Sequence, residues 1–393
     1  MTLRNFYNRF SLDESLIEGV GHNPYYRRID SGLNEKILVN GHEMIDLASN
    51  NYLGLATDDR VKRSAVEAVQ KYGVSLCGTP IATGYIELYQ SLEEKLSRFV
   101  GLEETIIFPS CYQANNGLFS SIADPHDLII VDRLVHSSLI QGIKSAGCKL
   151  RPFLHNNLEH LEEILQRSRG YRQVFVVTES VFSTEGSIAP FKEIVQLCDN
   201  YQAMPVIDDS HGIGVLGKSG QGILEEQGIE GYQGIYTASL GKALANSGGM
   251  ISGKKGLIDY LKYYCPHLVY STALTPAVLA GTEAVLNIIQ SEFGVLQERL
   301  LTYQQTIFES LVEAGFTVVP GEAPINSIQS GSKEATFILA KKFYDKGILG
   351  TPFIEPSVPI GEGRVRLIAG ANLSQAIIAE AVAIIKRIGC PRR

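Results

Sequence analysis

Two short stretches hold the residue types that could carry chemistry. Residues 206–212 read VIDDSHG, and residues 237–249 read TASLGKALANSGG, where Lys242 stands among small residues with no carboxylate nearby in the sequence. Because desolvating an ammonium is unfavourable, such a lysine is typical of one whose amine acts as a nucleophile or forms a Schiff base. Taken alone, the first stretch also fits a helix N-cap beside a surface histidine, and the second a solvated lysine at a strand end.

The two stretches are more informative as a pair. An aspartate that faces a pyridinium nitrogen is the usual complement of a Schiff-base lysine in pyridoxal-phosphate enzymes, and Asp208 and Lys242 both follow apparent strands. No metal site is expected, because the spacing in VIDDSHG matches no zinc motif and the six cysteines form no CxxC pair. The pair therefore favours a cofactor site over a metal site.

The elements that must position these residues alternate along the chain. Short apolar runs that predict buried strands occupy residues 104–110, 127–133, 174–180, 204–210 and 234–240. Amphipathic segments at 158–168 and 191–200 predict helices between them. This βαβα order predicts an α/β fold with a mostly parallel sheet covered by helices on both faces.

In such a sheet the ligand lies at the carboxyl ends of the strands. Residues that end or follow the predicted strands are therefore expected together at one edge: Ser110, Arg133, Glu179, Asp208 and Ser239.

The pattern changes after about residue 283. A long amphipathic stretch at 285–315 and a final one at 374–389 predict helices around shorter strands. We expect an N-terminal arm (1–50), a large cofactor-binding domain (51–282) and a smaller C-terminal α+β domain (283–393).

Composition narrows the class of protein. With 45% hydrophobic and 20% charged residues, the 393-residue chain is typical of a globular protein, and its net charge of −7 argues against general affinity for nucleic acid. The scattered cysteines, the lack of an apolar run of membrane-spanning length and an N-terminus without an apolar core (MTLRNFYNRF) favour a cytoplasmic protein.

Further motifs give the chain a family resemblance. Besides the two stretches above, they are ASNNYLGL (48–55), PSCYQANNGLF (109–119), DRLVHSSL (132–139), HNNLEHL (155–161), TESVFSTEGSIAP (178–190), YSTALTP (270–276) and GRVRL (363–367). In this order they resemble the α-oxoamine synthases, fold-type I pyridoxal-phosphate enzymes that include 8-amino-7-oxononanoate synthase, glycine C-acetyltransferase, 5-aminolevulinate synthase and serine palmitoyltransferase. The resemblance runs from about Arg28 to the C-terminus.

The resemblance implies pyridoxal 5'-phosphate as the cofactor and gives several residues a role towards it. Lys242 would hold the cofactor covalently and then act as the base at the substrate Cα. Asp208 would pair with the pyridinium nitrogen, His211 would reach the phenolic oxygen, and His136 would stack on the ring. The remaining contacts implied are the backbone N–H groups of Cys111 and Tyr112 and the Ser239 hydroxyl at the phosphate, with Ser183 and Glu179 as further cofactor or substrate contacts.

The resemblance also implies substrate and partner contacts. Arg366 would bind the amino-acid carboxylate, and Asn50 would face the same group. Arg364 lies two residues away on the same strand face, so geometry does not distinguish the two arginines. The family motif assigns the role to Arg366. Thr272 would reach the phosphate of a neighbouring subunit, which implies a homodimer with a shared active site.

The implied reaction is the decarboxylative condensation of an amino acid with an acyl-CoA or an acyl carrier protein to give an α-aminoketone. Glycine is favoured, with serine or alanine possible. Three departures from the family pattern bear on the substrate: Pro80 stands where relatives commonly have arginine, and Tyr89 and Leu373 stand where many have histidine.

Alternatives remain open at this point. SCYQANNGLF is most similar to glycine C-acetyltransferase, whereas TASLGKAL and HNNLEHL are also similar to the autoinducer-synthase branch, whose members make aminoketones from longer acyl donors. A fold-type I aminotransferase would share the lysine and the aspartate. A non-catalytic partner subunit would typically lack the lysine, which this chain keeps.

Overall fold

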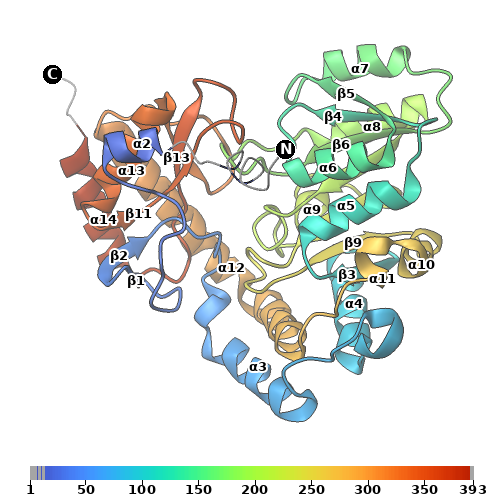
Figure 1. Ribbon diagram of the computed structural model, residues 1–393, viewed down its shortest axis with the longest axis horizontal. Helices are drawn as coiled ribbons and strands as arrows, with labels where there is room; N and C mark the ends of the chain where they lie inside the picture. Colours follow the sequence, from blue (N-terminus) through green and yellow to red (C-terminus); the bar gives the residue numbers. More distant parts are fainter. Residues whose placement is uncertain (1–6, 8–9, 11–13, 390–393) are drawn as a thin grey trace.

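A seven-stranded sheet organises the larger part of the molecule in a computed structural model that describes residues 7, 10 and 14–389 (Figure 1). Its strand order is β3 (Glu104–Phe108), β9 (Gly249–Gly253), β8 (Ile235–Ser239), β7 (Met204–Asp208), β6 (Val174–Glu179), β4 (Leu128–Asp132) and β5 (Lys149–Phe153). Only β9 runs against its neighbours. The predicted α/β fold with a mostly parallel sheet is confirmed.

Helices cover both faces of this sheet because successive strand residues point to opposite sides. Ile106 and Ile129 pack into one apolar cluster, and their neighbours Ile107 and Ile130 pack into the other. The first face is covered by α5 (Cys111–Ile122), α6 (Ser137–Ala146), α10 (Lys255–Tyr264) and α11 (Pro266–Val269). The second is covered by α4 (Glu87–Val100), α7 (Leu158–Gln166), α8 (Phe191–Tyr201), α9 (Ile223–Glu226) and part of α12 (Pro276–Glu313).

The C-terminal part builds a separate apolar cluster around two small sheets. One sheet has the order β10 (Asn326–Gly331), β13 (Gly363–Leu367) and β12 (Thr351–Phe353). The other has the order β1 (Lys36–Val39), β2 (His42–Asp46) and β11 (Ile348–Leu349). The remaining helices are α2 (Ser15–Val20), α3 (Asp59–Tyr72), α13 (Lys333–Tyr344) and α14 (Gln375–Ile388), with short turns η1 (Leu55–Thr57) and η2 (Pro80–Gly84).

The expected arm and the expected boundary at residue 282/283 remain predictions, but the elements at these places are clear. β2 pairs in parallel with β11, so residues 42–46 lie within the C-terminal part, as the blue and red ribbons of Figure 1 show. Residue 282 lies inside the continuous helix α12, which runs from one part to the other (Figure 1). Residues 1–6, 8–9 and 11–13, on which the absence of a secretory signal was judged, lie outside the described residues.

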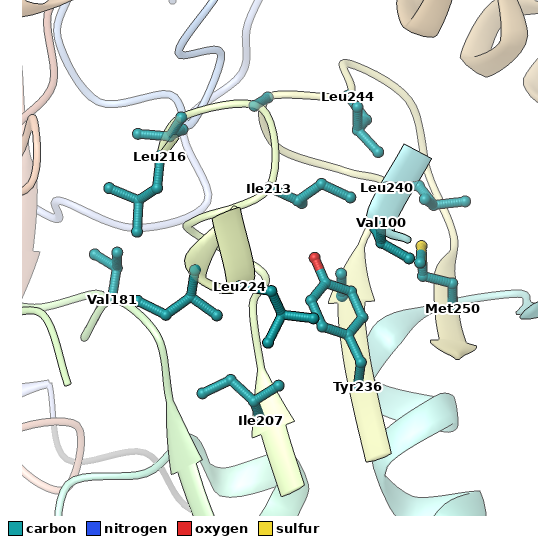
Figure 2. Close-up of a cluster of buried hydrophobic side chains, with 14 of the residues drawn as sticks. Val100, Val181, Ile207, Ile213, Leu216, Leu224, Tyr236, Leu240, Leu244 and Met250 are labelled. Atoms are coloured by element: carbon teal, nitrogen blue, oxygen red, sulfur yellow. The ribbon is translucent and has the colours of Figure 1, made fainter. Parts of the chain in front are cut away.

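The loops after β7 and β8 are held by apolar side chains (Figure 2). Ile213 and Leu216 follow His211, and Leu240 and Leu244 flank Lys242; all four are buried in the cluster that contains Tyr236 of β8. These contacts fix the loops that carry both polar side chains. Among the described residues, 7, 10 and 14–389, no helix is both long enough and apolar enough to cross a membrane.

Candidate active site

A cavity of about 340 Å³ opens at the carboxyl edge of the large sheet, where the ligand was expected. Its walls include seven of the predicted site residues: Cys111, Tyr112, His136, Asp208, His211, Ser239 and Lys242. Ser110 and Glu179 also line it. Arg133 directly follows β4 at this edge, as expected, but its side chain is exposed and does not line the cavity. β4 lies two strands from β7, and the Arg133 N–H bonds to Phe153 of the edge strand β5.

The N-terminus of α5 offers a place for an anion. The Ser110 side chain caps the helix by accepting from Gln113 N at 3.1 Å. The N–H groups of Cys111 and Tyr112 find no acceptor among the residues that the structure describes. Free N–H groups and the positive end of the helix dipole favour a bound phosphate at this point.

Gly249 of β9 allows the strand to pass close to this helix start. A Cβ at this position would lie 2.3 Å from Cys111 Cα and 2.4 Å from Cys111 N. Any side chain here would therefore push the strand away from the anion-binding turn.

Asp208 ends β7 and is 5% exposed. Its Oδ1 accepts from Ser210 N at 3.0 Å, and its Oδ2 accepts from Asn115 Nδ2 at 2.7 Å. Because each carboxylate oxygen has two acceptor positions, the group can still bind a cationic ring N–H. The fixed carboxylate suits a pyridinium partner.

Lys242 lies in the turn after β8, and its amine has no hydrogen-bond or ion-pair partner among residues 14–389. Burial lowers the pKa of the Lys242 amine, and the Asp208 charge opposes this effect only in part. A lysine held free of partners and with a lowered pKa is suited to covalent and base chemistry.

Two histidines face the same cavity. The backbone N–H of His136 donates to Glu179 Oε1 at 2.5 Å, and burial raises the pKa of the Glu179 carboxyl well above its usual value. His211 Nδ1 shares a 2.8 Å hydrogen bond with the Tyr52 hydroxyl. Burial holds the pKa of His211 well below its ordinary value, so its imidazole is neutral.

Arg366, Asn50 and Ser183 form a second cluster and do not line the cavity itself. Arg366 Nη2 donates to Asn50 Oδ1, and Nη1 donates to the Ser183 carbonyl, both at 2.9 Å. Its Nε is buried without a partner among the described residues. The Arg366 charge contributes to the lowered pKa values of His211 and Lys242, so the two clusters are electrostatic neighbours.

Arg364 has different surroundings. Its Nη1 lies 2.7 Å from Glu185 Oε2, and both side chains are less than 10% exposed. Arg366 has no carboxylate partner among residues 14–389. The positive charge of Arg366 is therefore the one left for a bound anion.

Thr272 is exposed and lies outside the cavity of its own chain. Its loop is held on both sides of the exposed residue. Ala273 N donates to the Gly78 carbonyl at 3.0 Å, and Leu274 N donates to the Tyr89 hydroxyl at 2.5 Å. Gln113 of α5 donates to the Ser271 hydroxyl at 3.0 Å.

The three departures from the family pattern have distinct surroundings. Tyr89 is buried and supports the Thr272 loop, and Leu373 is buried in the C-terminal apolar cluster. Pro80 lines another hollow beside Tyr89. Neither Tyr89 nor Leu373 lines the cavity that holds Lys242.

Sequence reasoning did not assign Tyr52, Asn115 or Ser138, which touch His211, Asp208 and His136 respectively. The signal was present, because all three lie inside motifs that carried the resemblance. No group of three or more metal-binding side chains occurs at residues 7, 10 or 14–389.

The residues present fit pyridoxal 5'-phosphate. The free N–H groups at α5 suit its phosphate, the Asp208 carboxylate suits its ring nitrogen, and the unpartnered Lys242 amine suits its aldehyde. Fold and cavity together define a fold-type I enzyme of this cofactor class.

Comparison with known proteins agrees. The aminotransferase class I and II family matches residues 42–385. The 8-amino-7-oxononanoate synthase of Geobacter sulfurreducens is 33% identical, over 92% of this chain and 93% of that protein. Its counterpart from Bacillus pumilus is 34% identical, over 92% of both chains.

Solved structures share the fold. The serine palmitoyltransferase of Sphingomonas wittichii has a TM-score of 0.91 at 25% identity and covers 98% of this chain and 96% of its own. The 8-amino-7-oxononanoate synthase of Francisella tularensis has a TM-score of 0.74 at 26% identity and covers 88% of this chain and 97% of its own. The chain belongs to the aminotransferase class I and II family, in its α-oxoamine synthase branch. It is a pyridoxal-phosphate-dependent acyltransferase.

Proposed function

We propose that the protein condenses an amino acid, with glycine favoured, with an acyl-CoA thioester and releases CO2 and free CoA, so that the product is an α-aminoketone. The named relatives support this reaction class. The observation that carries the proposal is a buried arginine, Arg366, without a carboxylate partner among the described residues, beside the Lys242 cavity. Arg366 could bind a substrate carboxylate next to Lys242, the lysine proposed for covalent catalysis.

The residues of the chain then have definite tasks. The bound cofactor supplies an electron sink for negative charge that develops at the substrate Cα. Lys242 would hold the cofactor and would take the Cα proton of the bound amino acid on Nζ. Asp208 would keep the ring nitrogen protonated, His211 would donate to the phenolic oxygen, and His136 would cover the ring face.

Phosphate and carboxylate would be bound at opposite ends of the site. The N–H groups of Cys111 and Tyr112, with the Ser239 hydroxyl, would hold the phosphate. Arg366 and Asn50 would hold the amino-acid carboxylate, and Ser183 would position Arg366 through its carbonyl. Glycine is favoured because of the family resemblance alone. No residue described above determines the size of the substrate side chain.

The active enzyme would be a cytoplasmic homodimer. In this arrangement Thr272 of one subunit reaches the phosphate held by the other. The exposed position of Thr272 outside its own cavity supports this arrangement, as do exposed aromatic side chains nearby, Tyr263, Tyr264 and Tyr270.

A substrate panel tests the proposal. Glycine, serine and alanine are each incubated with acetyl-CoA, pimeloyl-CoA and longer acyl-CoAs, and free thiol and CO2 are measured. Equal release of both with at least one pair is expected, with none in Lys242→Ala. Amino-group transfer to a 2-oxo acid without thiol release would instead identify an aminotransferase. Thiol release only from an acyl carrier protein thioester would show that this thioester, and not acyl-CoA, is the donor.

A further inference from the structure

A continuous set of hydrogen bonds joins two residues that face the cofactor from different elements. Asn115 of α5 donates from Nδ2 to Asp208 Oδ2 at 2.7 Å and to Ser138 Oγ at 3.0 Å. Ser138 Oγ lies 2.8 Å from His136 Nδ1. Asn115 and Ser138 are each 1% exposed, so the two bonds that Asn115 donates are shielded from water, whereas the bond to the more exposed His136 ring is part-buried.

The orientation of the Asn115 amide follows from the chemistry of its neighbours. An ionised carboxylate only accepts hydrogen bonds, so the atom that faces Asp208 must be the amide nitrogen. The two hydrogens of this nitrogen serve Asp208 and Ser138. The Asn115 Oδ1 atom is buried without a donor among the described residues, so the amide is held by these two bonds and not by its oxygen.

Close packing of α5 on α6 keeps the donor and the acceptors in place. A Cβ on Gly142 of α6 would lie 2.6 Å from the Asn115 carbonyl oxygen and 2.9 Å from Asn116 Cα. The neighbouring Asn116 also bridges the helices, since its Nδ2 donates to the Ser138 carbonyl at 3.0 Å. Asn116 does not contact Asp208 or the Ser138 hydroxyl.

The tautomer of His136 follows from the hydrogen bonds at its Nδ1 atom. Ser138 N donates to His136 Nδ1 at 3.3 Å, and because an amide N–H can only donate, Nδ1 must be the acceptor. The Ser138 hydroxyl therefore donates to Nδ1 as well, while it accepts from Asn115. Because Nδ1 accepts, the ring is neutral and its one proton is on Nε2, and partial desolvation, which lowers the pKa of His136, favours the same state.

We infer that Asn115 and Ser138 are positioning residues for the proposed reaction: they fix the Asp208 carboxylate and hold His136 as the Nε2–H tautomer. Asn115 acts on both residues, whereas Ser138 acts on His136 alone. Loss of Asn115 leaves the Asp208 carboxylate with only the bond from Ser210 N and lets the Ser138 hydroxyl rotate. Loss of the Ser138 hydroxyl leaves only the longer backbone bond to Nδ1.

Nitrogen NMR of holoenzyme labelled with 15N-histidine tests the tautomer directly. The wild-type spectrum is expected to show His136, assigned with His136→Gln, as a neutral ring protonated on Nε2. Ser138→Ala and Asn115→Ala are expected to show a mixture of tautomers, and Asn116→Ala the wild-type pattern. A wild-type His136 protonated on Nδ1, or on both nitrogens near neutral pH, overturns the inference without need of a variant.

Cofactor affinity tests the effect on Asp208. Asn115→Ala is expected to raise the dissociation constant of pyridoxal 5'-phosphate by about tenfold or more, as for loss of a hydrogen bond to a charged group. Ser138→Ala and Asn116→Ala should stay within about twofold, because hydrogen bonds to Asp208 are retained. Unchanged affinity and unchanged histidine signals in Asn115→Ala overturn the inference.

Neither measurement depends on turnover, so the inference and the proposed function fail separately. Holoenzyme with the expected NMR and affinity changes but no thiol release would reject only the proposed condensation. Thiol release by the wild type, with Asn115→Ala unchanged in affinity and spectrum, would reject only the positioning roles.

Discussion

Arg364 and Arg366 lie on the same face of β13, yet only Arg364 is neutralised, by Glu185. We expect Arg366→Lys to raise the KM for the amino acid by about tenfold or more, because a lysine cannot make the forked contact with a carboxylate. Steady-state kinetics with the amino acid varied measures this. Arg364→Lys is the matched control, and an equal or larger KM effect there would move the carboxylate site to Arg364.

Glu93 of α4 is a buried carboxyl away from the Lys242 cavity. It accepts from Tyr85 Oη at 2.8 Å and Ile107 N at 3.1 Å, and burial raises its pKa to about 7. Because this folded-state pKa exceeds the unfolded one, the stability that Glu93 contributes is present below about pH 4.5 and is lost as the pH rises towards 7.

We therefore expect the difference in unfolding free energy, Glu93→Gln minus wild type, to increase by about 3 kcal/mol as the pH rises from 4.5 to 7. Urea unfolding across this range, at fixed protein and cofactor concentrations, provides the measurement. The exposed neighbour Glu94→Gln should follow the wild-type pH dependence. Parallel curves for wild type and Glu93→Gln would show that Glu93 is ionised in the folded protein.

At residue level, the sequence predicted the polar groups that end strands and missed those that support them. Asp208 and Lys242 were predictable because strand ends share one edge of the sheet. The partners of His211 and Asp208 are Tyr52 and Asn115, which are 159 and 93 residues distant in sequence. No local pattern reports such long-range bonds, although the family motifs contained both residues.

Among the elements, β13 and the loop after β6 are joined by the buried Glu185–Arg364 pair. His155 Nε2 lies 3.7 Å from Glu185 Oε1, and its Nδ1 lies 3.1 Å from Asp132 Oδ1 at the end of β4. His155 therefore links the Glu185–Arg364 pair to β4 of the large sheet. It ties the strand that carries Arg366 to the edge of the large sheet that carries Asp208 and Lys242.

Glu185→Gln should destabilise the protein by about 3 kcal/mol, because it leaves the Arg364 guanidinium buried without its countercharge. Glu362→Gln removes the half-exposed partner of the same arginine and should cost less than about 1 kcal/mol. Urea unfolding of the two variants compares them. Equal losses would mean that the buried pair does not hold β13.

Element prediction succeeded where apolar runs were continuous and missed two strands of the large sheet. The five strands predicted from such runs are present, as are the helices expected at 158–168 and 191–200. β5 (KLRPF) has two basic residues and a proline at the sheet edge, and β9 (GMISG) begins and ends with glycine. Tertiary pairing, not local propensity, makes these segments strands.

For the whole molecule, the shared-site proposal gives a complementation test. Lys242→Ala and Thr272→Ala are co-expressed with different tags, and the mixed dimer is assayed. If Thr272 acts across the interface, the mixed dimer should have about half of wild-type activity, because one of its two sites has both residues intact. Activity no higher than that of Thr272→Ala alone would place Thr272 at the site of its own chain.

The antiparallel strand β9 has a consequence for how the chain matures on the ribosome. β3 precedes the anion-binding turn of α5, but its only partner in the large sheet is β9, with Phe108 opposite Gly249. At translation rates of 5–20 residues per second, roughly seven to thirty seconds separate the synthesis of these two residues. During that interval β3 is an unpaired edge, so the nascent chain is exposed to mispairing until β9 has emerged.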